Sequence, residues 1–361
     1  MKLGYFAPLP PARTGVADYA DALLCALRPH ADVAVNADGD SNLYQIGNNQ
    51  LHRDIYRRAI ERPGAVIVHD AVLHHFFLGS LDETAYVEEF VYNYGEWHRE
   101  HARTLWAHRA RSGVDPRYFA RPMLRRVAER SKVVFVHNPA AAALVKAHCE
   151  SARVVEIPHL YEAAPTPRGY LVERIRAAWG VPASAYLFGV FGHLRESKRL
   201  ESILQAFGKL GEECWLLIAG DFVSSNLARS MADVFNQPRV IRVPHQDDFW
   251  PAAHAVDACV NLKYPAAGET SGIGIRLMGI GKPVIVTAGF EVSRYPEGAC
   301  FRVDPGAAET AMLMDAMAYL SGCRADGREM GRIAAEHVRS LHEPDRVARL
   351  IVDSLADAPL E

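Results

Sequence analysis

A glycine-rich turn around residue 268 carries the strongest chemical signal in the sequence. Within PAAGETSGIGIRLMGIGKPVIVT, residues 265–287, five residues separate the end of a predicted strand from a helical pattern: Gly268, Glu269, Thr270, Ser271 and Gly272. Free backbone N–H groups at a helix start bind anions, and glycines let the backbone come close to them. The turn therefore predicts a diphosphate site on Thr270, Ser271 and Gly272, with Glu269 accepting hydrogen bonds from sugar hydroxyls. The alternative is a tight turn with a helix cap.

A second turn supplies positive charge. In VFGHLRESKRLESILQAF, residues 190–207, a predicted strand is followed by a turn and an amphipathic helix, and the turn holds four basic residues: His193, Arg195, Lys198 and Arg199. Basic side chains at the carboxyl end of a strand can bind an anion such as a diphosphate. We therefore expect Lys198 and Arg195 to bind a diphosphate. The alternative is an ordinary solvated helix start.

Histidines follow a buried strand in the first half of the chain. In VIVHDAVLHHFF, residues 66–77, the strand delivers His69 and Asp70 to its carboxyl end, and His74 and His75 follow as competitors. We expect His69 to be the functional histidine. A histidine in such a strand–helix turn is as often structural, because a neutral imidazole satisfies neighbouring polar groups equally well.

A Pro-rich turn precedes the first predicted helix, in PLPPARTGVADYADALLCAL. Gly15, with its neighbours Arg13 and Thr14, is a candidate phosphate contact, because glycine lets a backbone loop approach an anion closely. The same residues would serve equally as a helix start capped by Thr14.

No arrangement typical of a metal site stands out. Asp38-Gly39-Asp40 fits a D-x-D string of the kind that binds manganese or magnesium, but an Asp-Gly pair after a strand is first a loop signal. The six cysteines are scattered without C-x-x-C spacing, so neither a zinc site nor a disulfide framework is predicted. We expect no metal and no cofactor.

Composition indicates a water-soluble enzyme. Of the 361 residues, 49% are hydrophobic and 23% are charged, and the formal net charge of −3 gives no general attraction to nucleic acid. The N-terminus lacks the apolar core of a signal peptide, and no apolar stretch is long enough to span a bilayer. A cytoplasmic location is therefore expected.

Short apolar runs alternate with helical patterns along the whole chain, which is typical of parallel sheets covered by helices. The predicted strands fall into two series: KLGYFA, DVAVNA, AVIVHD, KVVFVHN and RVVEIPH, then YLFGVFG, CWLLIAG, RVIRVPH, ACVNLKY and KPVIVTA. Pro165, Pro167 and Gly169 interrupt the pattern between them. The sequence thus predicts an α/β protein with two doubly wound domains in tandem.

We expect the first domain to cover residues 1–168 and the second to cover residues 169–340, with residues 341–361 forming a helix that packs back on the first. Residues 86–130 should form a basic, aromatic helical segment of the first domain. Ligands in doubly wound sheets bind beyond the carboxyl ends of the strands. The active site is therefore expected in the cleft between the domains.

The order of these segments resembles glycosyltransferase family 4, whose members are retaining enzymes of the GT-B fold, with two Rossmann-like domains facing each other across a cleft. GKPVIV, residues 281–286, matches the end of the family's donor-site signature closely. Two glutamates eight positions apart precede this strand in the family. Here Gly268 and Arg276 stand at those positions, and Glu269 comes one residue after the first.

The basic turn is similar to the family's G-R-L-x-x-x-K-G segment, in which the arginine and lysine hold the donor diphosphate. Lys198 falls on the lysine, His193 replaces the arginine and Arg199 replaces the last glycine. By this resemblance, His193 and Arg276 are expected to contact the nucleotide. Glu269 is expected to contact the donor sugar, as is His69, and the Gly15 loop is expected to contact the phosphates.

The resemblance implies a metal-independent, retaining transfer of a hexose or deoxyhexose, with mannose or rhamnose as guesses, from a nucleotide diphosphate sugar. The expected acceptor is a hydroxyl of a glycan or lipid-linked glycan in surface polysaccharide synthesis, and residues 86–130 are expected to touch the inner face of a membrane or to form an ordinary acceptor surface. Two alternatives stay open: a GT-B sugar-nucleotide epimerase, and a non-catalytic nucleotide-sugar-binding subunit.

Overall fold

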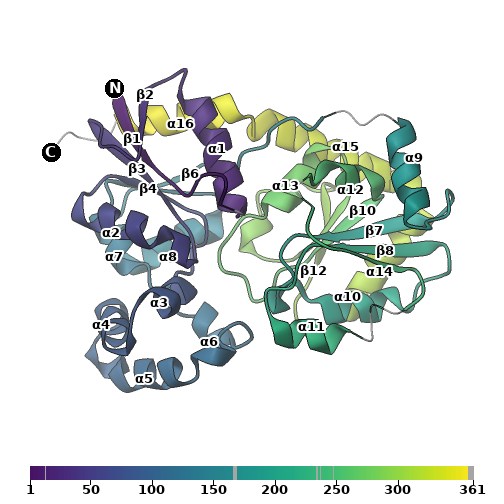
Figure 1. The fold of residues 1–361 in the computed structure, drawn as a ribbon, viewed down its shortest axis with the longest axis horizontal. Helices are drawn as coiled ribbons and strands as arrows, with labels where there is room; N and C mark the ends of the chain where they lie inside the picture. The colour runs from purple at the N-terminus through teal and green to yellow at the C-terminus, as the bar shows by residue number, and fades with distance from the viewer. Residues whose placement is uncertain (13, 166–168, 233–234, 236, 247, 357–361) are drawn as a thin grey trace. The chain divides into compact units, whose positions relative to one another are not determined.

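The computed structural model describes residues 1–12, 14–165, 169–232, 235, 237–246 and 248–356, and its contacts divide the chain into two compact units (Figure 1). Unit 1 comprises Met1–Leu160, Pro265–Thr270 and Leu341–Glu361, and unit 2 comprises Tyr161–Tyr264 and Ser271–Ser340. The predicted boundary lies at 168/169 and the predicted second domain includes residues 265–270, so the observed division differs at both points.

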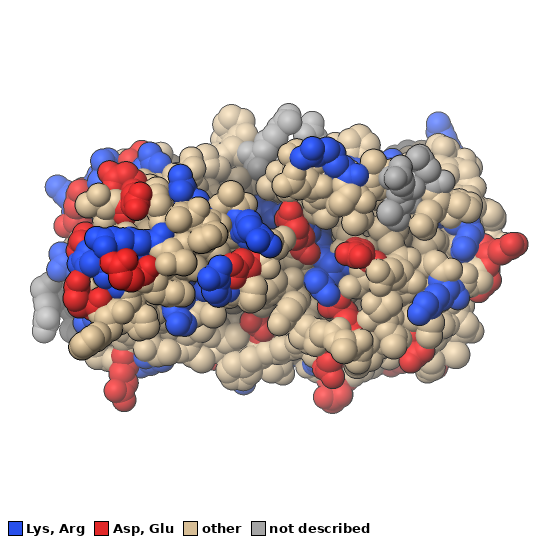
Figure 2. All heavy atoms as spheres, turned by 90° about the horizontal axis from the view of Figure 1, so that it is seen from below, with Lys and Arg blue, Asp and Glu red and all other residues tan. Residues whose placement is uncertain are grey.

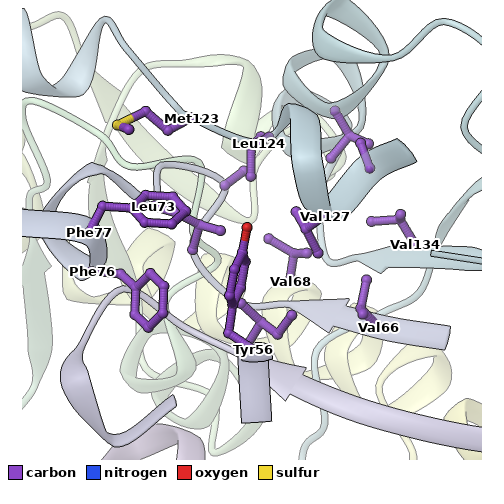
Figure 3. Packing of buried hydrophobic residues seen from close by; sticks show 14 of the residues in the cluster. Tyr56, Val66, Val68, Leu73, Phe76, Phe77, Met123, Leu124, Val127 and Val134 are labelled. Carbon is purple, nitrogen blue, oxygen red and sulfur yellow. The ribbon is translucent and has the colours of Figure 1, made fainter. Parts of the chain in front are cut away.

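Unit 1 is built on six parallel strands in the order β2-β1-β3-β4-β5-β6. Their bounds are β1 Lys2–Phe6, β2 Asp32–Val35, β3 Ser41–Ile46, β4 Ala65–Val68, β5 Val133–Val136 and β6 Val154–Glu156. In β4, Val66 and Val68 pack into the core on one face (Figure 3), and Ala65 and Ile67 pack on the other. Continuous apolar runs of this kind are typical of parallel strands that are covered on both faces.

The described part of unit 1 contains nine α-helices: α1 Gly15–Leu27, α2 Arg53–Glu61, α3 His74–Ser80, α4 Glu83–Tyr94, α5 Arg99–Ala107, α6 Pro116–Phe119, α7 Arg125–Arg130, α8 Pro139–His148 and α16 Pro344–Ala356. Helices α1 and α16 lie side by side and share one core, with Leu23 packed among Val347 and Ile351. Helices α2, α7 and α8 contribute to the core on the other face. Helices α4, α5 and α6 form a group beyond α3 (Figure 1).

Unit 2 contains a second parallel sheet, in the order β12-β11-β10-β7-β8-β9. Its strands are β7 Tyr186–Phe191, β8 Cys214–Ala219, β9 Val240–Val243, β10 Ala258–Asn261, β11 Val284–Thr287 and β12 Cys300–Val303. If its strands are numbered 1 to 6 in chain order and read from β9 to β12, the order is 3-2-1-4-5-6, which is that of a Rossmann sheet.

The described α-helices of unit 2 are α9 Gly169–Ala178, α10 Leu200–Phe207, α11 Ser225–Met231, α12 Trp250–Ala255, α13 Gly272–Gly279, α14 Glu309–Gly322 and α15 Arg324–Leu341. Helices α10 and α14 build the core on one face of the sheet, and α12, α13 and α15 build it on the other. Helix α15 approaches the α13–β11 turn so closely that a Cβ at Gly331 would lie 1.9 Å from the carbonyl oxygen of Gly281.

The predicted α/β class with two doubly wound units is confirmed, but the prediction omitted two strands. β3 contains Ser41, Asn42 and Gln45, which interrupt an apolar pattern, although Gln45 is buried. β12 is a four-residue strand at the edge of its sheet and contains Arg302. Both strands were missed because polar residues mask their periodicity.

Candidate functional site

In unit 2, the strand order reverses between β7 and β10. Ligands in doubly wound sheets bind in the crevice beyond the carboxyl ends of the strands at such a switch point. His193, Arg195 and Lys198 follow β7, and Ser271 and Gly272 lie on the connection from β10 to α13. The predicted phosphate-binding residues of unit 2 therefore flank its switch point.

The turn after β7 and the start of α13 touch each other. Gly192 has a φ of 88°, and a Cβ there would lie 2.4 Å from Cδ1 of Ile273 and 4.0 Å from Cε of Lys198. The N–H of Tyr264, after β10, donates to the carbonyl of Ser197 at 2.8 Å. Glycine is favoured at position 192, because its φ is positive and a Cβ there would press on the Ile273 side chain at the start of α13.

The first turn of α13 presents backbone donors. Ser271 caps the helix, and its Oγ accepts a hydrogen bond from the N–H of Gly274 at 3.2 Å. The N–H groups of Gly272 and Ile273 have no acceptor within the helix, because the first residues of any α-helix lack one. Arg276 lies one turn after Gly272 and on the same side. The helix start therefore suits an anion.

Basic residues follow β7 and β9, and the acidic Asp221 follows β8. Lys198, in the 3₁₀ turn Glu196–Lys198, is 6% exposed. Partial burial lowers the pKa of His193, and the positive charges of Arg195, His245 and Lys198 lower it further, against the opposite effect of Asp221. The unliganded ring is therefore neutral at pH 7. An added anion would favour its protonated form.

His245 and Asp221 were missed by the sequence analysis. The N–H of His245 donates to Oδ1 of Asp221 at 3.1 Å, so the two residues tie the loop after β9 to the loop after β8. Their positions in the sequence could have identified them. Each follows a predicted parallel strand, in CWLLIAGD and RVIRVPH, and polar side chains at such strand ends meet at one edge of a sheet.

In unit 1, His69 follows β4 and is 8% exposed. Its Nε2 lies 2.5 Å from Oε1 of Gln45, the Nε2 of Gln45 donates to the hydroxyl of Tyr5, and that hydroxyl donates to the carbonyl of Ala20. Because the Gln45 amide nitrogen donates to Tyr5, its oxygen accepts, and Nε2 of His69 carries the proton. Burial, and next the neighbouring His137, holds the pKa of His69 well below its usual value. The ring is therefore neutral, and its Nδ1 is a hydrogen-bond acceptor.

Three histidine rings surround Tyr19 of α1. The Tyr19 ring centroid lies 4.7 Å from that of His69, 5.1 Å from that of His137 and 5.0 Å from that of His159. His137 follows β5 and His159 follows β6, so the cluster marks the carboxyl edge of the unit 1 sheet. The sequence analysis missed Tyr19, His137 and His159, which separate strands bring together.

Gly15 is the first residue of α1, one turn before Tyr19. Oγ1 of Thr14 caps the helix by accepting from the N–H of Ala17 at 3.1 Å. The helix-start role proposed as the alternative is therefore present, and it leaves the Gly15 backbone at the carboxyl end of β1. Arg13 lies outside the described residues.

The turn at residues 265–270 packs on unit 1. Gly268 has a φ of 67°, and a Cβ there would lie 2.8 Å from Cβ of Ala71, two positions after His69. Oε2 of Glu269 accepts from the N–H of Ala267 at 2.7 Å. Glu269 and His69, the two residues predicted to contact the donor sugar, therefore belong to the same unit, and Gly268 leaves no room for the side chain found at the first glutamate position.

The competing residues near His69 have structural partners. Both ring nitrogens of His74 are engaged, one with a backbone carbonyl at 3.0 Å and the other with the hydroxyl of Tyr86 at 2.7 Å. Nε2 of His75 contacts a backbone carbonyl at 3.1 Å. Oδ2 of Asp70 accepts from the N–H of Asn48. The structural alternative therefore accounts for His74 and His75.

The basic helical segment carries its own counter-ions. Its ion pairs join Arg99 to Glu88 and Glu96, Arg103 to Glu100, Arg117 to Asp115, Arg125 to Glu129 and Arg126 to Glu89. Figure 2 shows acidic side chains interspersed with basic ones over this end of unit 1. Trp97, within this segment, is fully exposed. Across the described part of the chain, no helix combines the length and apolar character needed to cross a bilayer.

The D-x-D string has structural partners. Asp38 forms ion pairs with Arg58 and Arg62, and Oδ2 of Asp40 accepts from the N–H of Lys2 at 2.9 Å. Among the residues that the structure describes, no group of three His, Cys, Asp or Glu side chains is placed to hold a metal ion. Asp38 and Asp40 thus fasten β1 and α2 to their loop.

The chain is similar in fold to solved glycosyltransferases. HepE from Anabaena, solved in complex with UDP, is 15% identical with a TM-score of 0.64, and the match covers 99% of this chain and 100% of HepE. Sucrose-phosphate synthase from Thermosynechococcus elongatus is 14% identical with a TM-score of 0.69, over 99% and 98% of the two chains.

WaaG, a glycosyltransferase involved in lipopolysaccharide biosynthesis, is 13% identical with a TM-score of 0.63, over 98% of this chain and 100% of WaaG. No family model matches the chain, and no curated protein matches it in sequence. At such low identity the likeness establishes the fold, which is the α/β GT-B fold of these glycosyltransferases.

Proposed function

We propose that the chain is a retaining glycosyltransferase that moves a hexose or deoxyhexose from a nucleotide diphosphate sugar to a hydroxyl of a glycan or lipid-linked glycan in surface polysaccharide synthesis. The observation that carries this proposal is the contact between the basic turn after β7 and the start of α13, at the switch point of unit 2. The solved complex of HepE with UDP-glucose, whose fold covers 99% of this chain, supports a nucleotide sugar as the ligand.

In the proposed reaction, Lys198 and Arg195 stabilise the negative charge of the departing diphosphate together with the N–H groups of Gly272 and Ile273. The acceptor oxygen bonds to the anomeric carbon as the bond from that carbon to the phosphate oxygen breaks. A phosphate oxygen on the same face takes the acceptor's proton, which retains the anomeric configuration. No metal is required, because the cations and N–H groups neutralise the leaving group.

The neutral ring of His69 can accept a hydrogen bond from a hydroxyl of the donor sugar. Its Nε2–H is committed to Gln45, which leaves Nδ1 to accept a hydrogen bond from the donor sugar. Glu269 would accept from other hydroxyls, and His193 and Arg276 would contact the nucleotide. We propose mannose or rhamnose as the sugar, carried on GDP, dTDP or UDP.

The proposed acceptor surface is the α4–α7 segment of unit 1. A lipid-linked acceptor would bring this segment to the inner face of a membrane, and the fully exposed Trp97 is the side chain suited to that interface. Sedimentation with vesicles of anionic lipid measures this contact. Binding that Trp97→Ala abolishes supports it, and no vesicle binding by the unaltered protein contradicts it and favours a soluble glycan acceptor.

The nucleotide site is tested by calorimetry with GDP, UDP, dTDP and their sugar conjugates. Lys198→Ala should raise the Kd for one nucleotide family by about 10-fold to 100-fold, the usual effect of losing a charge-assisted hydrogen bond. Glu269→Ala should weaken only the sugar conjugates. Lys209→Ala, which removes an exposed lysine after α10, is the matched control and should bind like the unaltered protein.

The outcomes separate the alternatives. Failure of every nucleotide to bind would contradict the transferase. A change in the sugar without any acceptor would identify an epimerase. Binding without turnover under every acceptor would identify a non-catalytic subunit.

A further inference from the structure

We propose that Asn138 and Thr270 form a latch that positions the sugar-binding turn, so that Thr270 holds the backbone of Glu269 in place and does not bind phosphate. This inference rests on the proposed function, because Glu269 is the residue that the latch serves. It reassigns Thr270, which the sequence analysis places on the donor diphosphate.

Asn138 is a buried residue at the carboxyl end of β5, with 2% of its surface exposed. Its Nδ2 donates to the carbonyl of Gly268 and to Oγ1 of Thr270, both at 3.0 Å. Its Oδ1 accepts from the N–H of Ala141 at 2.9 Å and caps α8. Both N–H groups of the Asn138 amide therefore bind the 265–270 turn, and its oxygen binds α8.

The single proton of the Thr270 hydroxyl is already engaged. The hydroxyl accepts from Asn138 and donates its single proton to the carbonyl of His137 at 3.2 Å. A hydroxyl has one donor, and phosphate oxygens accept hydrogen bonds only, so Thr270 has no proton left for a phosphate. We therefore assign diphosphate binding to the next two residues, Ser271 and Gly272 of unit 2. They form the start of α13, which contacts the basic turn.

Glu269 lies between the two anchored positions. Gly268 is held by Asn138 and by close contact with Ala71, and Thr270 is held by Asn138 and His137. A residue fixed on both sides loses little freedom when it binds a ligand, and displacement of a contact by about 1 Å costs roughly 100-fold in rate. The latch therefore acts on turnover through Glu269.

Three variants test the latch. Thr270→Val removes the hydroxyl and keeps the shape of the side chain, Thr270→Ser keeps the hydroxyl, and Asn138→Ser keeps a cap for α8 while removing the Nδ2 donor. Thr270→Val and Asn138→Ser should each lower kcat/KM for the sugar nucleotide by about 10-fold to 100-fold. Their Kd for the bare nucleoside diphosphate should stay within about twofold of the unaltered protein, since that ligand does not reach Glu269.

Two further comparisons separate a latch from loss of folding. Thr270→Ser should restore most of the lost activity, and the double variant Asn138→Ser/Thr270→Val should lose no more than either single variant, because both remove one connected unit. Ser354→Ala removes a hydroxyl that donates to the carbonyl of Leu350 within α16, outside the proposed donor and acceptor sites, and should leave the kinetics unchanged.

Three results would overturn the latch. Equal weakening of nucleoside diphosphate and sugar nucleotide by Thr270→Val would make Thr270 a phosphate ligand and overturn the proposal. Unchanged kinetics in both single variants, or fully additive losses in the double variant, would also overturn it. Absence of nucleotide binding by the unaltered protein would instead overturn the proposed function, and this inference with it.

Discussion

His193 stands where the family 4 resemblance expects an arginine, and this single difference alters the chemistry of the basic turn. Arginine stays charged at every working pH, whereas the pKa of His193 is lowered by partial burial and by the neighbouring Arg195, His245 and Lys198. A diphosphate placed beside His193 would raise its pKa again. Nucleotide binding should then be accompanied by proton uptake.

We predict that the affinity for a nucleoside diphosphate rises by about threefold for each pH unit between 8 and 6, because only the complex favours the charged ring. In His193→Arg the affinity should follow only the titration of the nucleotide's own phosphate, which affects both proteins equally. Calorimetry at pH 8, 7 and 6 measures this. The same pH slope in both proteins would rule out His193 as the titrating group.

At the scale of elements, the basic turn is fixed to the start of α14. Arg199 adopts the left-handed conformation with a φ of 58°, a conformation favoured by the glycine that the resemblance expects there. Its Nε donates to Oε1 of Glu309 at 2.8 Å, and the Glu309 side chain is 2% exposed. This ion pair between the partly exposed Arg199 and the buried Glu309 therefore offsets the backbone strain and joins the turn to α14.

Arg199→Gly should destabilise unit 2 despite relieving this strain. Loss of one partner of a fully buried pair costs about 3–5 kcal/mol, and the cost should be at most about 3 kcal/mol here because the Arg199 side chain is 35% exposed. Glycine removes strain worth about 1–2 kcal/mol, so the net loss should be about 1–2 kcal/mol. Urea denaturation measures it. Adding Glu309→Gln should recover part of the loss. A single variant as stable as the unaltered protein would show that the pair contributes nothing.

At the scale of the whole molecule, sequence order and unit membership differ. The chain leaves unit 2 after Tyr264, contributes Pro265–Thr270 to unit 1 and returns at Ser271, and its last segment belongs to unit 1 again. A turn flanked by two elements of unit 2 thus carries Glu269 on unit 1. Unit 1 also buries several neutral histidines, which make its stability sensitive to acid.

Unit 1 should lose stability as the pH falls from about 6.5 toward 4. Burial lowers the pKa of His74 to about 3 and of His137 to about 4, and it also lowers the pKa of His69. The unfolded chain, with histidine pKa values near 6.5, binds protons in a pH range where these histidines of the folded unit stay neutral. The stabilisation is therefore complete above pH 6.5 and decreases below it.

The expected loss is about 1 kcal/mol per pH unit for each of these histidines. Denaturation at pH 7.5, 6 and 5 checks the slope, and His137→Gln should reduce it by one histidine's share. A free energy of unfolding that stays constant between pH 7.5 and 5 would contradict the prediction.

The sequence predicted the architecture because apolar runs report burial directly. β4 and β5 are four-residue apolar runs that are buried completely, and both were found. β3 was missed because glutamine is usually a surface residue, whereas Gln45 is buried and its hydrogen bonds to His69 and Tyr5 satisfy its amide. Those partners lie 24 and 40 positions away, beyond the reach of local periodicity.

The α/β class, the two series of parallel strands and a set of candidate residues for a diphosphate are predictable from the sequence, because strand periodicity and turn chemistry are local properties. Which of those residues already have partners within the protein depends on contacts that form only when the chain folds. Thr270 is engaged by Asn138, 132 positions earlier, and Arg199 by Glu309, 110 positions later. Hydrogen bonds and ion pairs of this kind form between side chains that folding alone brings within 3 Å, so no spacing in the sequence reveals them.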